Sequence, residues 1–199
     1  TESGIFRMAG VPESVVDARV RDLWRSLSPG ETLALQIEGG EVHLRALVSG
    51  PDPRIVSARM GELAAAIRDR LGDDLYATGE TSLEAAVVAR LTAMKARLAA
   101  AESVTGGMLA SRIVSVPGAS EALAACFVAY GEGAKSRLLG LPAELLADGG
   151  AVSAGTAKAM AAAARRLAGA EFGIATTGYA GPGGGTERDP VGTVYVALE

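Results

Sequence analysis

The chain has little of the residues on which most hydrolytic and metal chemistry depends. It contains one cysteine and one histidine in 199 residues. Cys126 cannot form an internal disulfide bond or a cysteine-rich zinc site, so we expect a small core residue there. His43 alternates with apolar residues over 41–48, which predicts a place on the solvent face of a strand. Ser-His-Asp and Cys-His catalysis in the second half of the chain is excluded, and we expect no metal site and no cofactor.

Long apolar runs and an excess of basic charge are also missing. No stretch approaches the roughly 20 apolar residues of a membrane span, and no signal pattern opens the chain, which predicts a cytoplasmic protein with no membrane partner. Residues 1–80 hold 9 Lys and Arg against 13 Asp and Glu, and 81–199 hold 10 of each. Neither half has the basic surface that a nucleic-acid partner requires. Because the chain starts without Met and stops after a strand-like run, we expect a fragment.

The first part of the chain predicts a small α+β domain. An amphipathic helix is expected after 12–14, followed by a hairpin of strands 32–37 and 41–48, a helix that 51–53 opens and that ends at Gly72, and a short strand at 75–76. A turn-rich stretch, 77–82, marks the boundary. We therefore divide the chain into domains 1–78 and 79–199, and expect the first to contribute no catalytic group.

The second part alternates between strands and helices, which predicts an α/β sandwich with a mixed or partly parallel sheet. The expected elements are helix 83–96, strand 97–102, helix 105–114, strand 122–130, helices 132–138 and 153–168, and strands 172–177 and 192–198. Ligands of such folds collect beyond the carboxyl ends of the strands. The unusual stretches 102–107, 130–135 and 176–185 each follow a strand.

Ser103 lies where a buried-looking strand turns into a helix. A serine or threonine at such a point commonly caps the helix through its side chain, and Ser103 or Thr105 could do only that. The same turn leaves N–H groups free, which suits an anion or a developing oxyanion. Ser103 is therefore either a cap or a nucleophile, and as a nucleophile it needs a base other than histidine.

Lys135 is the best candidate for that base. Of the three lysines, Lys95 and Lys158 occupy positions where a solvated charge is expected. Lys135 comes one helical turn after a buried-looking strand, from where it can point back over the sheet edge, although an exposed helix lysine is the plainer interpretation. Burial would lower its pKa and let it accept a serine proton. The distance from Ser103 Oγ to Lys135 Nζ is the decisive test.

A glycine-rich loop, 181–186, follows the third strand end. Its backbone N–H groups could surround a phosphate or close over a substrate. It matches neither the phosphate-binding Walker pattern nor the dinucleotide fingerprint, so alone it is weak evidence.

The order and spacing of several short motifs closely resemble the C-terminal domain of the CinA (competence/damage-inducible) family. The motifs are AESVTGG at 101–107, VPGAS at 116–120, VAY at 128–130, AK at 134–135, LG at 139–140, GAVS at 150–153, TG at 177–178 with AGPGGG at 180–185, and PVGTVY at 190–195. The resemblance is dense over 83–199. Residues 5–78 more loosely resemble the KH-type linker domain that precedes it in the family.

The resemblance implies a metal-free amidohydrolase that converts nicotinamide mononucleotide (NMN) to nicotinate mononucleotide and ammonia. Ser103 would attack the carboxamide carbon, Lys135 would take its proton, and Tyr130 would hydrogen-bond the pair or stack on the nicotinamide ring. N–H groups near Thr105 and Gly106 would hold the oxyanion. The remaining substrate-binding residues would be Gly107, Thr177, Gly178, Gly181, Gly183 and Gly184. A homodimer or larger homo-oligomer is also implied.

This sequence departs from the family pattern at several points. Gly131, Glu132 and Gly133 replace Ser-Asn-Glu, so Glu132 could hold Lys135 charged and slow it as a base. Tyr179 replaces a small aliphatic residue, and the family's later arginine-bearing segment lies beyond Glu199. One alternative is a catalytically impaired nucleotide-binding or regulatory module. Another is RNA binding by residues 5–78, which the acidic balance disfavours.

Overall fold

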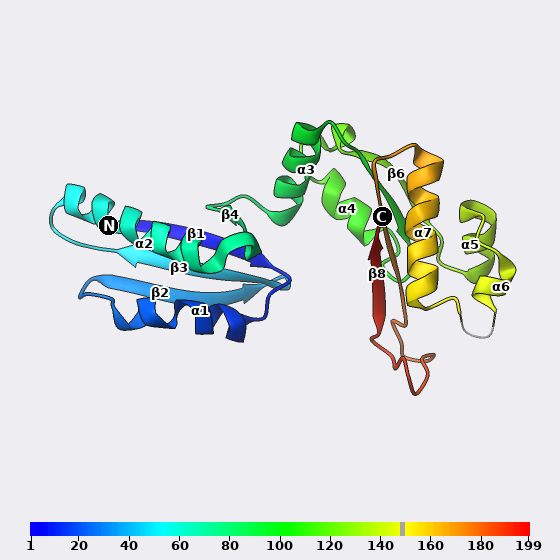
Figure 1. Cartoon of the computed structure of the whole chain (residues 1–199), viewed down its shortest axis with the longest axis horizontal. Helices are drawn as coiled ribbons and strands as arrows, with labels where there is room; N and C mark the ends of the chain where they lie inside the picture. The colour runs from blue at the N-terminus through cyan, green and yellow to red at the C-terminus, as the bar shows by residue number, and fades with distance from the viewer. Residues whose placement is uncertain (148–149) are drawn as a thin grey trace. The chain divides into compact units, whose positions relative to one another are not determined.

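Two sheets, each covered by its own helices, make up the chain in this computed structural model, which describes residues 1–147 and 150–199 (Figure 1). The contacts divide the chain into the units Thr1–Ala86 and Val87–Glu199. This division falls a few residues later than the boundary read from the turn-rich stretch, since the start of a helix stays with the first unit. In the part of the chain that the structure describes, no helix is both long and apolar enough to span a bilayer.

The first unit is a four-stranded antiparallel sheet in the order β2-β3-β1-β4, with two helices packed on one face. Its elements are β1 (Glu2–Ala9), α1 (Glu13–Arg25), β2 (Glu31–Glu38), β3 (Glu41–Val48), α2 (Pro53–Leu71), the 3-10 turn η1 (Gly72–Asp74) and β4 (Leu75–Thr78). The expected hairpin is present as β2 and β3. Large side chains, among them Met8, Leu44 and Ile67, fill the core between sheet and helices.

Two expectations for this unit are wrong. The sequence prediction begins with a helix, but β1 precedes it and lies between β3 and β4; the alternation of buried Phe6 and Met8 with Arg7 was the missed signal. His43 is only 4% exposed. It does alternate with core residues along β3, but Arg7 and Glu41 cover it, since Nε2 lies 3.3 Å from Arg7 Nη1 and 3.4 Å from Glu41 Oε2.

The second unit is a mixed sheet in the order β6-β5-β7-β8, in which β5 runs parallel to both neighbours and β8 is antiparallel to β7. Its elements are α3 (Leu83–Met94), β5 (Leu98–Glu102), α4 (Met108–Val114), the 3-10 turn η2 (Ala119–Glu121), β6 (Leu123–Val128), α5 (Glu132–Leu139), α6 (Ala143–Leu146), α7 (Ala154–Ala168), β7 (Phe172–Gly178) and β8 (Val194–Leu198). The predicted fold class is confirmed. Helix α6 was not expected, and α4 begins three residues later than predicted.

Helices cover both faces of this sheet, and α7 lies along one of them (Figure 1). On β5, Ala99 and Ala101 belong to the core beneath α7, whereas Leu98 packs with α3 and α4 on the opposite face. The approach of α7 is so close that a Cβ at Gly173 on β7 would lie 2.2 Å from Ala161 O. The alanine-rich sequence of α7 thus serves close helix-sheet packing.

Candidate active site

The carboxyl ends of three parallel strands meet at one edge of the second sheet. Glu102, the last residue of β5, pairs with Val128 on β6 and with Thr176 on β7. The residues that follow these strands therefore lie next to one another, as the sequence predicted from their unusual composition. Ser103 follows β5 directly, Tyr130 follows β6, and Thr177 lies at the end of β7.

Ser103 is 5% exposed and is held mainly by its backbone. Its N–H donates to Thr176 O at 2.9 Å, which continues the pairing with β7 by one residue. Its hydroxyl donates to Tyr130 O at 3.3 Å, a long hydrogen bond. Ser103 does not cap α4, because that helix begins five residues later. Its hydroxyl is thus fixed only loosely at the sheet edge.

The predicted cap residue of α4, Thr105, does not cap the helix either. Thr105 Oγ1 shares a hydrogen bond of 2.7 Å with Thr176 Oγ1. The N-cap of α4 is Gly107, which has a φ of 103° and no side chain to offer. The first N–H groups of the helix instead donate to the carboxylate of Glu102, which sequence reasoning missed. A carboxylate at the end of a buried strand, just before a helix, was the signal that could have found it.

The oxyanion donors on the turn after Ser103 differ in part from those that the sequence suggested. The Gly106 N–H donates to Ser103 O at 3.0 Å, and the Gly107 N–H donates to Glu102 Oε2 at 3.0 Å. The N–H groups of Val104 and Thr105 have no acceptor among residues 1–147 and 150–199. Of the donors that lie near Ser103, these two could hold a developing negative charge.

Lys135, on the first turn of α5, is 2% exposed. Its Nζ donates to Ala151 O at 2.6 Å and to Thr177 Oγ1 at 3.0 Å. Thr177 Oγ1 in turn donates to Ala151 O at 2.9 Å. Burial lowers the pKa of Lys135, and the negative charge of Glu132 opposes this only in part. The lysine is thus held by neutral oxygens in a setting that favours its neutral form.

The N-terminal end of α7 fixes the carbonyl that Lys135 contacts. The Ser153 hydroxyl caps the helix by accepting from the Thr156 N–H at 3.1 Å and donates to Gly150 O at 3.0 Å. These bonds hold the backbone on both sides of Ala151. Thr177, predicted to bind substrate, is fully buried and directed at Lys135 and Ala151. Its place in this structure is therefore beside the lysine rather than on an open pocket wall.

Ser103 and Lys135 come to the same sheet edge but do not bond to each other. Among the described residues, no hydrogen bond joins Ser103 Oγ to Lys135 Nζ. A neutral lysine amine has two N–H groups and one lone pair. In that form, both N–H groups of Lys135 would be used on Ala151 O and Thr177 Oγ1, which leaves the lone pair as the remaining position on Nζ.

Tyr130 takes part in the site through its backbone. Its carbonyl accepts the Ser103 hydroxyl, whereas its side chain is 68% exposed. Of the two roles that the sequence suggested for it, stacking on a substrate ring suits an exposed aromatic side chain better than a hydrogen bond to the buried pair.

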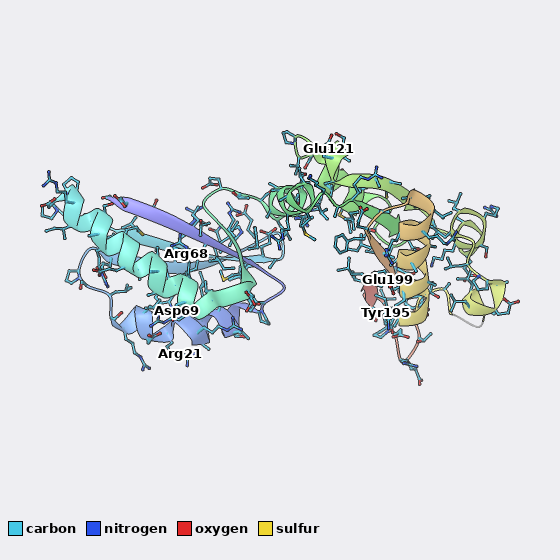
Figure 2. All side chains as sticks on the ribbon, turned by 45° about the horizontal axis from the view of Figure 1, so that its top comes forward. Arg21, Arg68, Asp69, Glu121, Tyr195 and Glu199 are labelled. Atoms are coloured by element: carbon cyan, nitrogen blue, oxygen red, sulfur yellow. The ribbon has the colours of Figure 1, made fainter. Side chains whose placement is uncertain are left out.

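The glycine-rich loop leaves the end of β7 at this same edge and returns into β8. A Cβ at Gly178 would lie 2.6 Å from Thr193 O, and Gly181, with a φ of 81°, would bring one within 2.6 Å of Val191 Cγ1. Gly183 and Gly184 are exposed. Tyr195 on β8, labelled in Figure 2, donates to Asp189 Oδ1 at 2.6 Å and so ties the far side of the loop to the sheet.

Two family models match this chain. The CinA C-terminal domain matches residues 80–199, and the damage-inducible protein CinA KH domain matches residues 3–77. The chain belongs to the CinA family. Among the described residues, no three His, Cys, Asp or Glu side chains gather as a metal site would require.

Curated relatives and solved structures agree with this assignment to the CinA family. The chain is 42% identical over 196 residues to a CinA-like protein of Desulfovibrio desulfuricans, covering 98% of this chain and 46% of that protein. A CinA-like protein of Anaeromyxobacter dehalogenans is also 42% identical, over 98% of this chain and 48% of its own. The chain thus spans about half the length of these relatives.

Two solved structures share the fold. The competence/damage inducible protein CihA from Agrobacterium tumefaciens is 38% identical with a TM-score of 0.57, over 59% of this chain and 71% of its own. The competence damage-inducible protein A from Klebsiella pneumoniae is 39% identical with a TM-score of 0.56, over 60% and 75%.

Proposed function

We propose that this chain deamidates nicotinamide mononucleotide to nicotinate mononucleotide and ammonia, with Ser103 as nucleophile and Lys135 as base. The observation that carries the proposal is the state of Lys135. It is buried, its pKa is lowered, and both of its bonded partners are uncharged oxygens at the sheet edge that bears Ser103. A lysine whose pKa is lowered is neutral, and so able to accept a proton, at a lower pH than an exposed lysine.

In the first half of the reaction, Ser103 Oγ attacks the carboxamide carbon while its proton passes to the lone pair of Lys135 Nζ. The hydroxyl must turn away from Tyr130 O to reach Nζ, and its long bond there makes this turn easy. Such contacts commonly tighten only when substrate is bound. The N–H groups of Val104 and Thr105 stabilise the oxyanion of the tetrahedral intermediate.

The intermediate collapses when the Lys135 ammonium gives its proton to the amide nitrogen and the C–N bond breaks, so that the nitrogen leaves as ammonia. This leaves an acyl ester on Ser103 and a neutral lysine. Water then attacks the ester carbon, Lys135 takes the water proton, and its return to Ser103 Oγ releases the carboxylate product. The cycle needs one base that can change its charge, which a buried lysine provides and an arginine does not.

The glycine-rich loop, 181–186, and the exposed Tyr130 side chain provide the remaining substrate contacts in this proposal. The exposed Tyr130 ring stacks on the nicotinamide ring, and the N–H groups of Gly181, Gly183 and Gly184 face the ribose phosphate. The predicted homo-oligomer, and the absence of nucleic-acid and membrane partners, stay predictions.

Two observations favour a second candidate, a domain that binds the nucleotide without turning it over. The Ser103 hydroxyl bonds to Tyr130 O instead of Lys135, and Glu132 opposes the lowering of the Lys135 pKa. Both features would slow a serine/lysine pair. Binding of NMN without ammonia release would favour this candidate over the enzyme.

Ammonia release from NMN tests the proposal directly. Ser103→Ala should abolish release and cost about 0.5–1.5 kcal/mol of stability, the range for one neutral hydrogen bond. Lys135→Arg should also be inactive, whereas Lys158→Arg, at an exposed lysine of α7, should keep full activity. Full activity of Lys135→Arg, from about pH 6 to about pH 10, would remove the lysine from the mechanism.

A further inference from the structure

The carboxylate of Glu102 is completely buried between β5 and the turn that carries Ser103. Oε2 accepts from the N–H groups of Gly107 and Leu109 at 3.0 and 3.1 Å, and Oε1 accepts from the Ala110 N–H at 2.8 Å. Burial alone would raise the pKa of Glu102, but hydrogen bonds from Thr105, Ala110, Leu109 and Cys126 outweigh it and lower the pKa. Glu102 is therefore an ionised carboxylate surrounded by donors.

Cys126, on the neighbouring strand β6, completes this shell. Its thiol donates to Glu102 Oε1 at 3.4 Å. Burial, together with the adjacent carboxylate, raises the pKa of Cys126 to about 12. The half-buried cysteine is thus a neutral hydrogen-bond donor to Glu102, and this explains its place in the fold better than apolar core packing does.

These bonds fix the geometry of the turn after the nucleophile. The Glu102 side chain reaches past four residues to bind the start of α4, so the chain over 103–106 closes a loop whose two ends are tied together. Gly106 and Gly107, at φ of 59° and 103°, let the backbone fold back over the carboxylate. The Val104 and Thr105 N–H groups are kept out of the helix hydrogen bonding as a result.

We infer that Glu102 is a positioning residue that holds the Ser103 turn and directs its two free N–H groups toward the oxyanion. The inference rests on the proposed amidohydrolase function for its catalytic consequence. It assigns a role to a charged residue that does not contact Lys135 and does not itself transfer a proton. With Gln at this position, one of the two acceptor oxygens becomes an NH₂ group that faces N–H donors, so the shell cannot close.

The test compares Glu102→Gln with Cys126→Ala in the full chain. We expect Glu102→Gln to lower kcat about 100-fold with a much smaller change in KM. A misplaced turn stabilises the transition state less well, whereas substrate binding in the ground state changes little. Cys126→Ala leaves the Glu102 carboxylate and its backbone N–H donors in place, so it should retain most of kcat. Glu102→Asp, one methylene shorter, should recover part of the activity, since it restores both oxygens and the charge.

Hydrogen exchange gives a second readout that does not depend on the reaction. In Glu102→Gln, the Gly107, Leu109 and Ala110 amides should exchange faster, while the β5 amides keep their protection. An inactive wild type would refute the proposed function. Hydrogen exchange alone would then test whether Glu102 holds the turn in place. Wild-type kcat in Glu102→Gln, or unchanged exchange at those three amides, would overturn the inference. If Glu102→Gln fails to fold, kcat and the exchange of the same three amides are measured in Glu102→Asp instead. Wild-type values there would overturn the inference.

Discussion

The two units of this chain are stabilised in different ways. The first packs large apolar side chains such as Phe6, Leu44 and Ile67, and its charged side chains form ion pairs, as Arg59 does with the buried side chain of Glu31 at 2.7 Å. The second packs alanines beneath α7 and buries charged groups within its fold. The second arrangement suits chemistry at a buried site, because burial without an ion pair lowers the pKa of a group such as Lys135.

The partners of the charged groups show the same contrast. Arg70 and the exposed Asp22 of the first unit form an ion pair, which lowers the pKa of the aspartate and raises that of the arginine. Glu102 and Lys135 of the second unit bond to backbone groups, hydroxyls and a thiol instead of to opposite charges. A lysine paired with a carboxylate would stay protonated, whereas one held by neutral oxygens can act as a base.

The largest loss of stability that we expect follows from truncating one side chain in the core of the first unit. Leu63, on α2, is 2% exposed, so Leu63→Ala should cost about 2–5 kcal/mol of unfolding free energy. Denaturant unfolding measures the loss. The rate of ammonia release per folded molecule should stay unchanged, because we expect the first unit to contribute no catalytic group. A slower reaction in fully folded Leu63→Ala would contradict the prediction that the first unit takes no part in catalysis.

A smaller loss should follow from adding one methyl group where α7 approaches the second sheet. Gly173→Ala places a Cβ against Ala161 O, so α7 must move, at a cost of about 1–3 kcal/mol. Gly61→Ala in α2, where a Cβ meets nothing within 4 Å, should instead stabilise the chain by about 0.4–1 kcal/mol. Thermal unfolding of the two variants should give opposite shifts, and a stabilised Gly173→Ala would contradict the close approach of α7 to the sheet.

The pH dependence of stability should show the burial of Lys135. Because its pKa is lowered in the folded state, the unfolded chain holds more protons at this position between the lowered value and 10.5. Stability should therefore rise with pH through that window, and Lys135→Met should remove this rise. Urea unfolding at several alkaline pH values measures it. Lys158→Met serves as the exposed control and should follow the wild type; an unchanged slope in Lys135→Met would contradict the buried state.

The smallest effect concerns Glu132, whose charge opposes the lowering of the Lys135 pKa. Glu132→Gln should lower that pKa further and move the acid limb of the kcat/KM profile to lower pH, by less than about one unit. The measurement is ammonia release across pH. Glu121→Gln, on the exposed turn η2, is the matched control. A shift toward higher pH would show that Lys135 is not the group that titrates.

Local patterns in the sequence determined most elements and the edge where the site lies. The β2-β3 hairpin, the alternation in the second unit and the strand-end position of Ser103 all follow from short-range periodicity and turn residues. Counting residue types removed histidine and cysteine chemistry and left Lys135 as the base to test. These conclusions need no knowledge of which distant residues meet.

Only the tertiary structure determined which side chains are buried and which groups they hydrogen-bond. His43 alternates as an exposed strand residue should, but side chains of Arg7 and Glu41 bury it. The Glu102 carboxylate, rather than Thr105, binds the first N–H groups of α4, and Thr177 reaches Lys135 from 42 residues away. Hydrogen-bond partners and burial are set by contacts between segments far apart in the chain, and local periodicity carries no information about those contacts.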